Sequence, residues 1–188
     1  RYGYSFTGFV NGDDETVLTG EVTLSCGYSV GSDVGEYVID ASGVSSDDYD
    51  ITYDLGKLTV VKADYDMSGI TFTDRSYEYD GTVRNIAISG TLPTGIDGEQ
   101  VSVSYSAGSK DVVYRKEIVA TFSTDSDNYN IPAPMKAYLT VYGKEVVVSA
   151  EPKSKFYGDN DPEFTTTVTG LIGDDTIDYE VQREQGET

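Results

Sequence analysis

The chain has 188 residues, of which 38% are hydrophobic and 24% charged, and it contains no apolar run long enough to span a membrane as a helix. Asp and Glu total 33 against 13 Lys and Arg, so the formal net charge of -20 repels phosphate polyanions and excludes nucleic acid or an anionic membrane surface as an expected partner. Without His, and with Cys26 as the single Cys, the sequence lacks the commonest general base, an internal disulfide and a tetrahedral thiolate metal site.

Short runs of alternating apolar and polar residues follow one another along the chain. Val22, Leu24 and Cys26 alternate with polar residues in the first run, and the same period of two recurs at 101–106 and 118–122. Turn signals that contain Gly, Asn, Asp or Pro separate the runs. Since no long stretch has a helical period, we predict an all-β fold.

Several phrases of the sequence occur twice, about 80 residues apart. GVSSDDYDI at 43–51 matches STDSDNYNI at 123–131, and Leu-Thr-Val at 58–60 recurs at 139–141. Two further pairs, EYVIDA with EIVATF and SYEYDG with SKFYGD, keep the same order and a similar spacing. Four anchors in one order predict a β-module of about 80 residues that the chain uses more than once.

The repeat divides the chain into three predicted segments. Residues 1–62 are the later part of one module, residues 63–143 a complete module, and residues 144–188 the beginning of a further module. About seven short strands in each module predict two sheets on a shared core, an immunoglobulin-like β-sandwich. A small β-roll or grasp-like module is the alternative that the pattern leaves open.

Short glycine-centred motifs resemble those of a known family. Tyr157-Gly158-Asp159-Asn160-Asp161-Pro162 and the following Thr-Gly and Gly-Asp-Asp turns resemble the MBG domain of the YGX type. The middle segment is similar to the related YDG-type module through Tyr79-Asp80-Gly81, but it has Arg-Lys-Glu-Ile at 115–118 where such modules have Gly-x-Tyr. The resemblance implies tandem modules of large exported bacterial proteins, often classed as adhesins, with no catalytic site of their own.

Two groups of residues are candidates for special roles. Asp159, Asp161 and Glu163 alternate in GDNDPE and are candidate oxygen ligands for Ca²⁺, the alternative being a turn whose carboxylates face water. We expect no other cofactor. Tyr49 and Tyr129 are expected to bury their rings and to bond their hydroxyls to nearby backbone, by analogy with the tyrosine corner of sandwich folds. The remaining motif residues are assigned structural roles; they are Tyr79, Gly81, Tyr157, Gly158 and Pro162.

These observations predict a non-enzymatic, extracellular segment of a bacterial surface protein, serving as an adhesin module or as a stalk. Host glycans or surface proteins are its expected partners, and the alternative is a carbohydrate-binding accessory module of a secreted enzyme. Residues 1–62 lack the opening strands that residues 144–163 contain. We therefore also predict that another copy adds its tail strands to the sheet edge of 1–62, the alternative being that the chain ends cut a repeat array arbitrarily.

Overall fold

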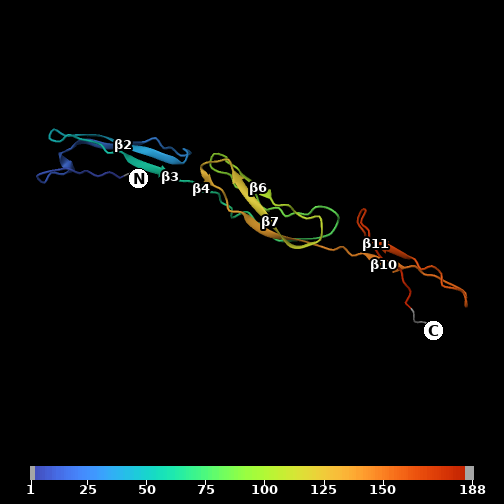
Figure 1. The fold of residues 1–188 in the computed structure, drawn as a ribbon. Helices are drawn as coiled ribbons and strands as arrows, with labels where there is room; N and C mark the ends of the chain where they lie inside the picture. The colour runs from blue at the N-terminus through green and yellow to red at the C-terminus, as the bar shows by residue number, and fades with distance from the viewer. Residues whose placement is uncertain (1–2, 185–188) are drawn as a thin grey trace. The chain divides into compact units, whose positions relative to one another are not determined.

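The structure, a computed structural model, describes residues 3–184, and its regular elements confirm the all-β prediction (Figure 1). Eleven strands and one short 3₁₀ helix form the regular structure of these residues, and no helix among them has the length and apolar character needed to cross a membrane. The chain divides into two compact units. The first comprises the residues up to Met67, Leu92–Ser102 and Ser123–Pro132; the second comprises Ser68–Thr91, Val103–Phe122 and the residues from Ala133 onward.

An antiparallel sheet of three strands lies in the N-terminal segment (1–62). Its order is β1-β2-β3, and the 3₁₀ helix Glu15–Val17 precedes it, capped by the Asp14 carboxylate, which accepts a hydrogen bond from the Thr16 amide at 2.9 Å. The strands are β1 (Thr19–Cys26), β2 (Gly35–Ser45) and β3 (Gly56–Val60).

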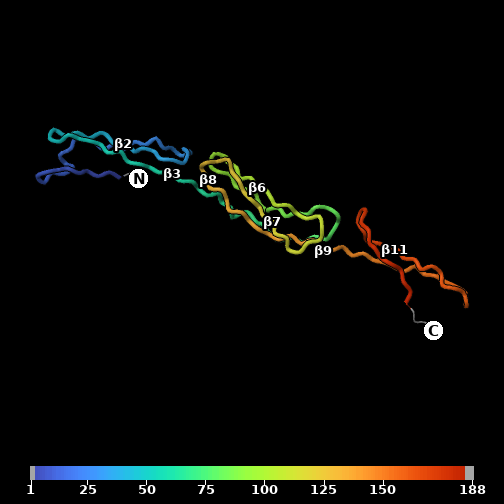
Figure 2. The backbone as a smooth tube through the Cα atoms, in the orientation of Figure 1, coloured from blue at the N-terminus to red at the C-terminus, as the bar shows by residue number. Residues whose placement is uncertain are grey.

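The middle segment (63–143) contains a four-stranded sheet in the order β5-β9-β7-β6, whose path can be followed in Figure 2. The β7–β9 pair is antiparallel, whereas β5 runs parallel to β9. A second, two-stranded parallel sheet joins β4 to β8. The strands are β4 (Ala63–Asp64), β5 (Arg75–Glu78), β6 (Val101–Tyr105), β7 (Val113–Thr124), β8 (Tyr129–Asn130) and β9 (Met135–Tyr142).

The C-terminal segment (144–184) contributes one antiparallel pair. In this pair β10 (Val147–Ala150) faces β11 (Thr166–Thr169) over four residues. All four residues of β10 are exposed. A two-stranded pair of this kind has little stability of its own in water, so it depends on whatever packs against it.

The buried core lies wholly within the middle segment. Twelve apolar residues are buried, and none of the other described residues, including all those at 3–62 and 144–184, reaches the same degree of burial. The core consists of Tyr65, Ile70, Phe72, Ile86, Val101, Ile118, Ala120, Phe122, Tyr129, Ala137, Leu139 and Val141.

Matching strands of the repeat keep the same inward face but bury it to different extents. In β2 the apolar face is only half-buried, whereas the matching residues Ile118, Ala120 and Phe122 of β7 are at most 3% exposed. Likewise Leu58 of β3 is half-buried, while Leu139 of β9 has no exposed surface. The pattern of period two therefore sets which side chains face inward. How fully those side chains are buried depends on whether other residues pack over that face of the sheet.

Candidate functional site

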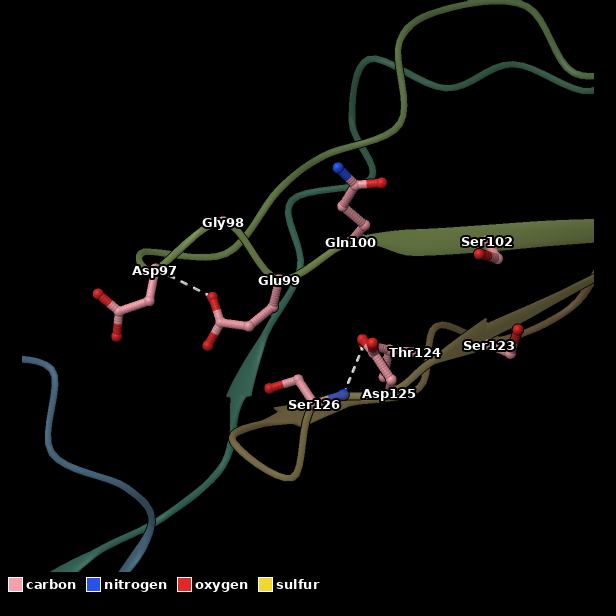
Figure 3. Close-up of a pocket in the computed structure, with 9 residues that line it drawn as sticks. All are labelled: Asp97, Gly98, Glu99, Gln100, Ser102, Ser123, Thr124, Asp125 and Ser126. Carbon is pink, nitrogen blue, oxygen red and sulfur yellow. Dashed lines mark hydrogen bonds between the residues drawn. The ribbon is translucent and has the colours of Figure 1, made fainter.

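A polar pocket of about 710 Å³ lies beside the start of β6 and the end of β7 (Figure 3). One wall is the loop that leads into β6, and the other is formed by the last residues of β7 and the loop after it. All of its lining residues belong to the first compact unit. The lining consists of Asp97, Gly98, Glu99, Gln100, Ser102, Ser123, Thr124, Asp125 and Ser126.

Local hydrogen bonds shape both walls of the pocket. The Asp97 amide donates to Glu99 Oε2 at 3.0 Å, which turns the Glu99 side chain back toward the loop (Figure 3). On the other wall the Ser126 amide donates to Thr124 Oγ1 at 3.2 Å. The Tyr65 hydroxyl lies 2.9 Å from the same Thr124 oxygen, so a core residue anchors this wall.

The chemistry of the pocket is that of an acceptor surface. Asp97, Glu99 and Asp125 supply carboxylates, the serines and Thr124 supply hydroxyls, and the lining contains neither Lys nor Arg nor an aromatic ring. Such a lining suits ligands that bring hydroxyl or ammonium donors, and it repels phosphate.

The two repeated tyrosines anchor loops from a distance. The Tyr129 ring is buried and stacks on Tyr65 with centroids 4.3 Å apart, and its hydroxyl accepts a hydrogen bond from the Ile96 amide at 3.0 Å. Tyr49 is half-buried; its hydroxyl accepts from the Val10 amide at 3.3 Å. In both repeats, therefore, a tyrosine hydroxyl accepts a hydrogen bond from the backbone of a loop that lies earlier in the same segment, at Ile96 for Tyr129 and at Val10 for Tyr49.

The Tyr49 hydroxyl has a second partner. It donates to Asp13 Oδ2 at 2.6 Å, and this bond to a carboxylate raises the pKa of Tyr49 above its usual value. Tyr79 makes a matching contact, since its hydrogen bond to the Asp175 carboxylate raises the pKa of Tyr79. Both tyrosine hydroxyls therefore stay protonated and remain hydrogen-bond donors throughout the physiological pH range.

Asn128 joins the middle segment to the N-terminal segment within the first compact unit. Its amide nitrogen donates to Asp33 Oδ1 at 2.9 Å, and its amide oxygen accepts from the Val34 backbone N–H at 2.8 Å. Its own backbone carbonyl accepts from the Ala63 amide at 3.0 Å. The Asn128 side chain thus both donates a hydrogen bond to the loop before β2 and accepts one from it.

A second junction joins the middle segment to the C-terminal segment within the second compact unit. Here the hydrogen bond from Tyr79 to Asp175 is accompanied by a close approach of Gly81 to Ile172. A Cβ atom on Gly81 would lie 3.0 Å from the Ile172 methyl carbon, and Gly81 has a φ of +74°. The Tyr-Asp-Gly motif therefore lies at a contact between two segments.

The sequence pattern of the MBG domain of the YGX type matches residues 1–59 and 146–188, which together make up more than half of the chain. The chain belongs to the MBG domain family. No curated protein and no solved structure matched it. MBG domains are non-catalytic modules typical of bacterial surface proteins.

The acidic residues after the MBG-type Tyr-Gly motif do not converge on one point. Asp161 pairs with Lys155, at 2.7 Å, and with Arg183, and the hydrogen bond from Lys155 lowers the pKa of Asp161. Asp159 donates its backbone N–H to the Phe156 carbonyl at 3.1 Å. Among residues 3–184 no group of three or more Cys, Asp or Glu side chains is placed to hold a metal ion, and Glu163 lies exposed.

The other MBG motif residues form a turn at the surface. Tyr157 is fully exposed, Gly158 has a φ of +89° that favours glycine, and Pro162 is half-buried. The turn closes between Phe156 and Asp159, which places the Tyr157 ring outward. The motif residues in the C-terminal segment therefore shape a turn rather than a cavity.

No residue of the pocket lining was predicted from the sequence as a site residue, although Ser123, Thr124, Asp125 and Ser126 belong to the repeated phrase at 123–131. One signal for this wall was present in the repeat. Ser126 accepts a hydrogen bond from the Asn128 amide at 3.1 Å, and the equivalent Ser46 accepts from the Asp48 amide at 3.2 Å. A turn conserved in both copies marks the loop, but only the structure places it opposite the loop before β6.

Proposed function

We propose that this chain is a non-enzymatic stalk segment of an extracellular bacterial surface protein, in which side-chain contacts fix each module to the next. The observation that carries the proposal is the two-way pairing of Asn128 with Asp33 and Val34. A flexible string of modules needs no such bridge. A stalk that holds its ligand-binding parts away from the cell does need one.

The choice of residue at 128 supports this role. The equivalent position in the first repeat is Asp48, whose side chain has no N–H donor. An aspartate at 128 would place a second carboxylate about 3 Å from that of Asp33 and would repel it. Asparagine is thus the residue that suits the contact between these two segments.

The experiment is the substitution Asn128→Asp, followed by ¹⁵N relaxation and residual dipolar couplings of the 188-residue chain. In the wild type we expect one alignment tensor to fit the residual dipolar couplings of both the N-terminal and the middle segment. In the variant we expect two tensors to be needed, since repulsion between two carboxylates replaces the hydrogen bond from Asn128 to Asp33. Asn130→Asp is the matched control, because the Asn130 amide donates to Asp64 within the middle segment. One shared alignment in Asn128→Asp would contradict the proposed role of the bridge.

Adhesion to a glycan is a second candidate, favoured by the acceptor-rich pocket beside β6. Sugar hydroxyls are donors that carboxylates and serine hydroxyls can bind. Screening of the chain on a glycan array is expected to give hits that Glu99→Gln and Asp125→Asn weaken at least tenfold. Hits that survive both substitutions would place sugar binding elsewhere on the surface, and Lys57→Gln, a change outside the pocket lining, is the control.

A further inference from the structure

An Asn-Gly pair forms the tip of a tight turn in the N-terminal segment. Asn11 and Gly12 have φ values of +57° and +87°, and the Asp13 amide donates a hydrogen bond to the Val10 carbonyl at 3.0 Å. Positive φ at both central residues is characteristic of a type I′ turn, in which Asn followed by Gly is a favoured pair. The backbone geometry therefore favours Asn and Gly at these two positions.

The same pair of residues is chemically labile. The backbone nitrogen that follows an Asn can attack the side-chain amide carbon, and glycine hinders this attack least because it has no Cβ. Within residues 3–184 the Gly12 N–H has no hydrogen-bond acceptor, and no atom lies within 4 Å of the point that a Cβ on Gly12 would occupy. Asn11 is exposed. Both reacting groups are therefore accessible to water and hydroxide.

The other four asparagines lack this combination of features. The residue that follows each of them is Ile, Tyr or Asp, whose side chain shields the backbone nitrogen. Three of their side-chain amides also donate hydrogen bonds of 2.8 to 3.0 Å, those of Asn85, Asn128 and Asn130. Asn11 is therefore the asparagine of this chain that is most exposed to attack by its own backbone.

The Tyr49 side chain binds both ends of the turn. Its hydroxyl accepts a hydrogen bond from the Val10 amide at 3.3 Å and donates one to Asp13 Oδ2 at 2.6 Å. Attack of the Gly12 nitrogen requires rotation about the Cα–C bond of Asn11, and this rotation opens the turn. The two hydrogen bonds of Tyr49 therefore oppose the attack.

From these observations we propose that Asn11 is a site of spontaneous deamidation, at a rate set by opening of the turn that Tyr49 holds. The Gly12 nitrogen loses its proton to hydroxide and attacks Cγ of Asn11. The Cγ–Nδ2 bond breaks, and Nδ2 takes a proton from water and leaves as ammonia. Water then adds to either carbonyl carbon of the cyclic imide and breaks its bond to nitrogen, which leaves aspartate or isoaspartate at position 11.

Isoaspartate at position 11 abolishes the contacts of Tyr49 with the turn. Its main chain runs through the side-chain methylene, so the path from Val10 to Asp13 gains an atom. The hydrogen bond between these two residues and both bonds to Tyr49 depend on the original path. The loop is thus fixed in the new protein and is released irreversibly as the protein ages. This chemistry needs only water and does not depend on the proposed stalk function.

The first test follows the 188-residue chain during incubation in a mildly alkaline buffer. Digestion in acid stops the reaction, mass spectrometry measures the replacement of NH by O in each asparagine peptide, and electron-transfer fragmentation distinguishes isoaspartate from aspartate. We expect Asn11 to react at least tenfold faster than any other asparagine, with isoaspartate as the larger product. Equal rates at Asn11 and at Asn160, which is also exposed, would overturn the proposal.

A pair of tyrosine variants tests the role of Tyr49. Tyr49→Phe keeps the ring and removes the hydroxyl, so we expect Asn11 to react about fivefold faster, the factor that corresponds to one net hydrogen bond. Tyr53→Phe is the matched control, because the Tyr53 hydroxyl also bonds to a backbone amide and a carbonyl, both of Val44 in β2. An unchanged rate in Tyr49→Phe, or the same acceleration in both variants, would overturn the role of Tyr49.

The Val10 amide reports on the consequence of the reaction. Ion exchange separates the modified chain through its added negative charge, and NMR compares hydrogen exchange at Val10 in the two fractions. We expect faster exchange in the isoaspartate fraction. The control is Asn11→Asp, which adds the same charge but keeps the normal main chain and should exchange as the unmodified protein does. Unchanged exchange in the isoaspartate fraction would contradict release of the loop.

Discussion

At the scale of single residues, two tyrosines perform the same task in the two repeats. The Tyr129 and Tyr49 hydroxyls accept hydrogen bonds from backbone amides 33 and 39 positions earlier in the chain. The difference lies in burial, since Tyr129 is 9% exposed and stacks on Tyr65. A buried hydroxyl that satisfies a backbone amide contributes more than one that water can replace.

Replacement of Tyr129 by Phe keeps the ring and removes only the hydroxyl. The Ile96 amide then loses its partner, so we expect a loss of about 1 kcal/mol in the free energy of unfolding. Urea denaturation of the wild type and the variant measures this difference. Tyr114→Phe is the control, because the Tyr114 side chain is 82% exposed. Equal losses in both variants would show that the bond to Ile96 does not stabilise the fold.

The sequence identifies these tyrosines as a pair but does not identify the loops that they hold. The phrases around 49 and 129 match, which marks both residues as members of one repeat. The loops at Val10 and Ile96 lie far away in the sequence, and local patterns carry no information about such pairings. The sequence therefore predicts that the Tyr49 and Tyr129 hydroxyls bond to backbone, but it does not show which backbone amide each hydroxyl meets.

At the scale of elements, periodicity predicts the strands well and their partners poorly. The alternating runs at 22–26, 101–105 and 118–122 all lie in strands, in β1, β6 and β7. The parallel pairing of β5 with β9 is not visible in the sequence, because a strand of four residues has too short a pattern to reveal its neighbour.

The departure from the Gly-x-Tyr pattern has a structural explanation in β7. Arg115 has a φ of +51°, in the left-handed region that favours glycine, one residue before the position that aligns with Gly35 of the first repeat, and the β7–β9 register shifts at this point. The Arg115 guanidinium lies 4.2 Å from the centre of the Tyr138 ring and pairs with Asp74 at 3.4 Å. These contacts offset the strain that a side chain meets at a bulge.

At the scale of the whole molecule, the burial of apolar residues is uneven. Among residues 3–184 the buried apolar side chains all lie between 65 and 141, so the middle segment holds most of the stability that area burial provides. The sequence predicted the repeat but not this inequality, because matching phrases such as Leu-Thr-Val are identical whether or not a second layer covers them. Similarly, the pocket beside β6 requires two loops to meet, which composition does not reveal.

Hydrogen exchange tests this uneven distribution. We expect amides of β7 and β9 to exchange only by global unfolding, and those of β2 and β3 to exchange at least tenfold faster. Mass spectrometry of peptides from the exchanged chain measures both sets, and β1 provides an internal comparison for β2. Equal protection of β2 and β7 would contradict the confinement of the core to the middle segment.

In the stalk proposed above, the side-chain amide of Asn128 has a consequence for which modules can follow one another. A module with Asn at this position can hydrogen-bond a carboxylate on the preceding module, as Asn128 does with Asp33. A module with Asp there, like Asp48, would repel that carboxylate and would favour a preceding module that presents an ammonium or a hydroxyl group. The exchange of Asn for Asp at this one position would thus determine which modules can be neighbours. Shuffling of repeats by recombination would then be filtered by the compatibility of their ends, and not only by whether each one folds.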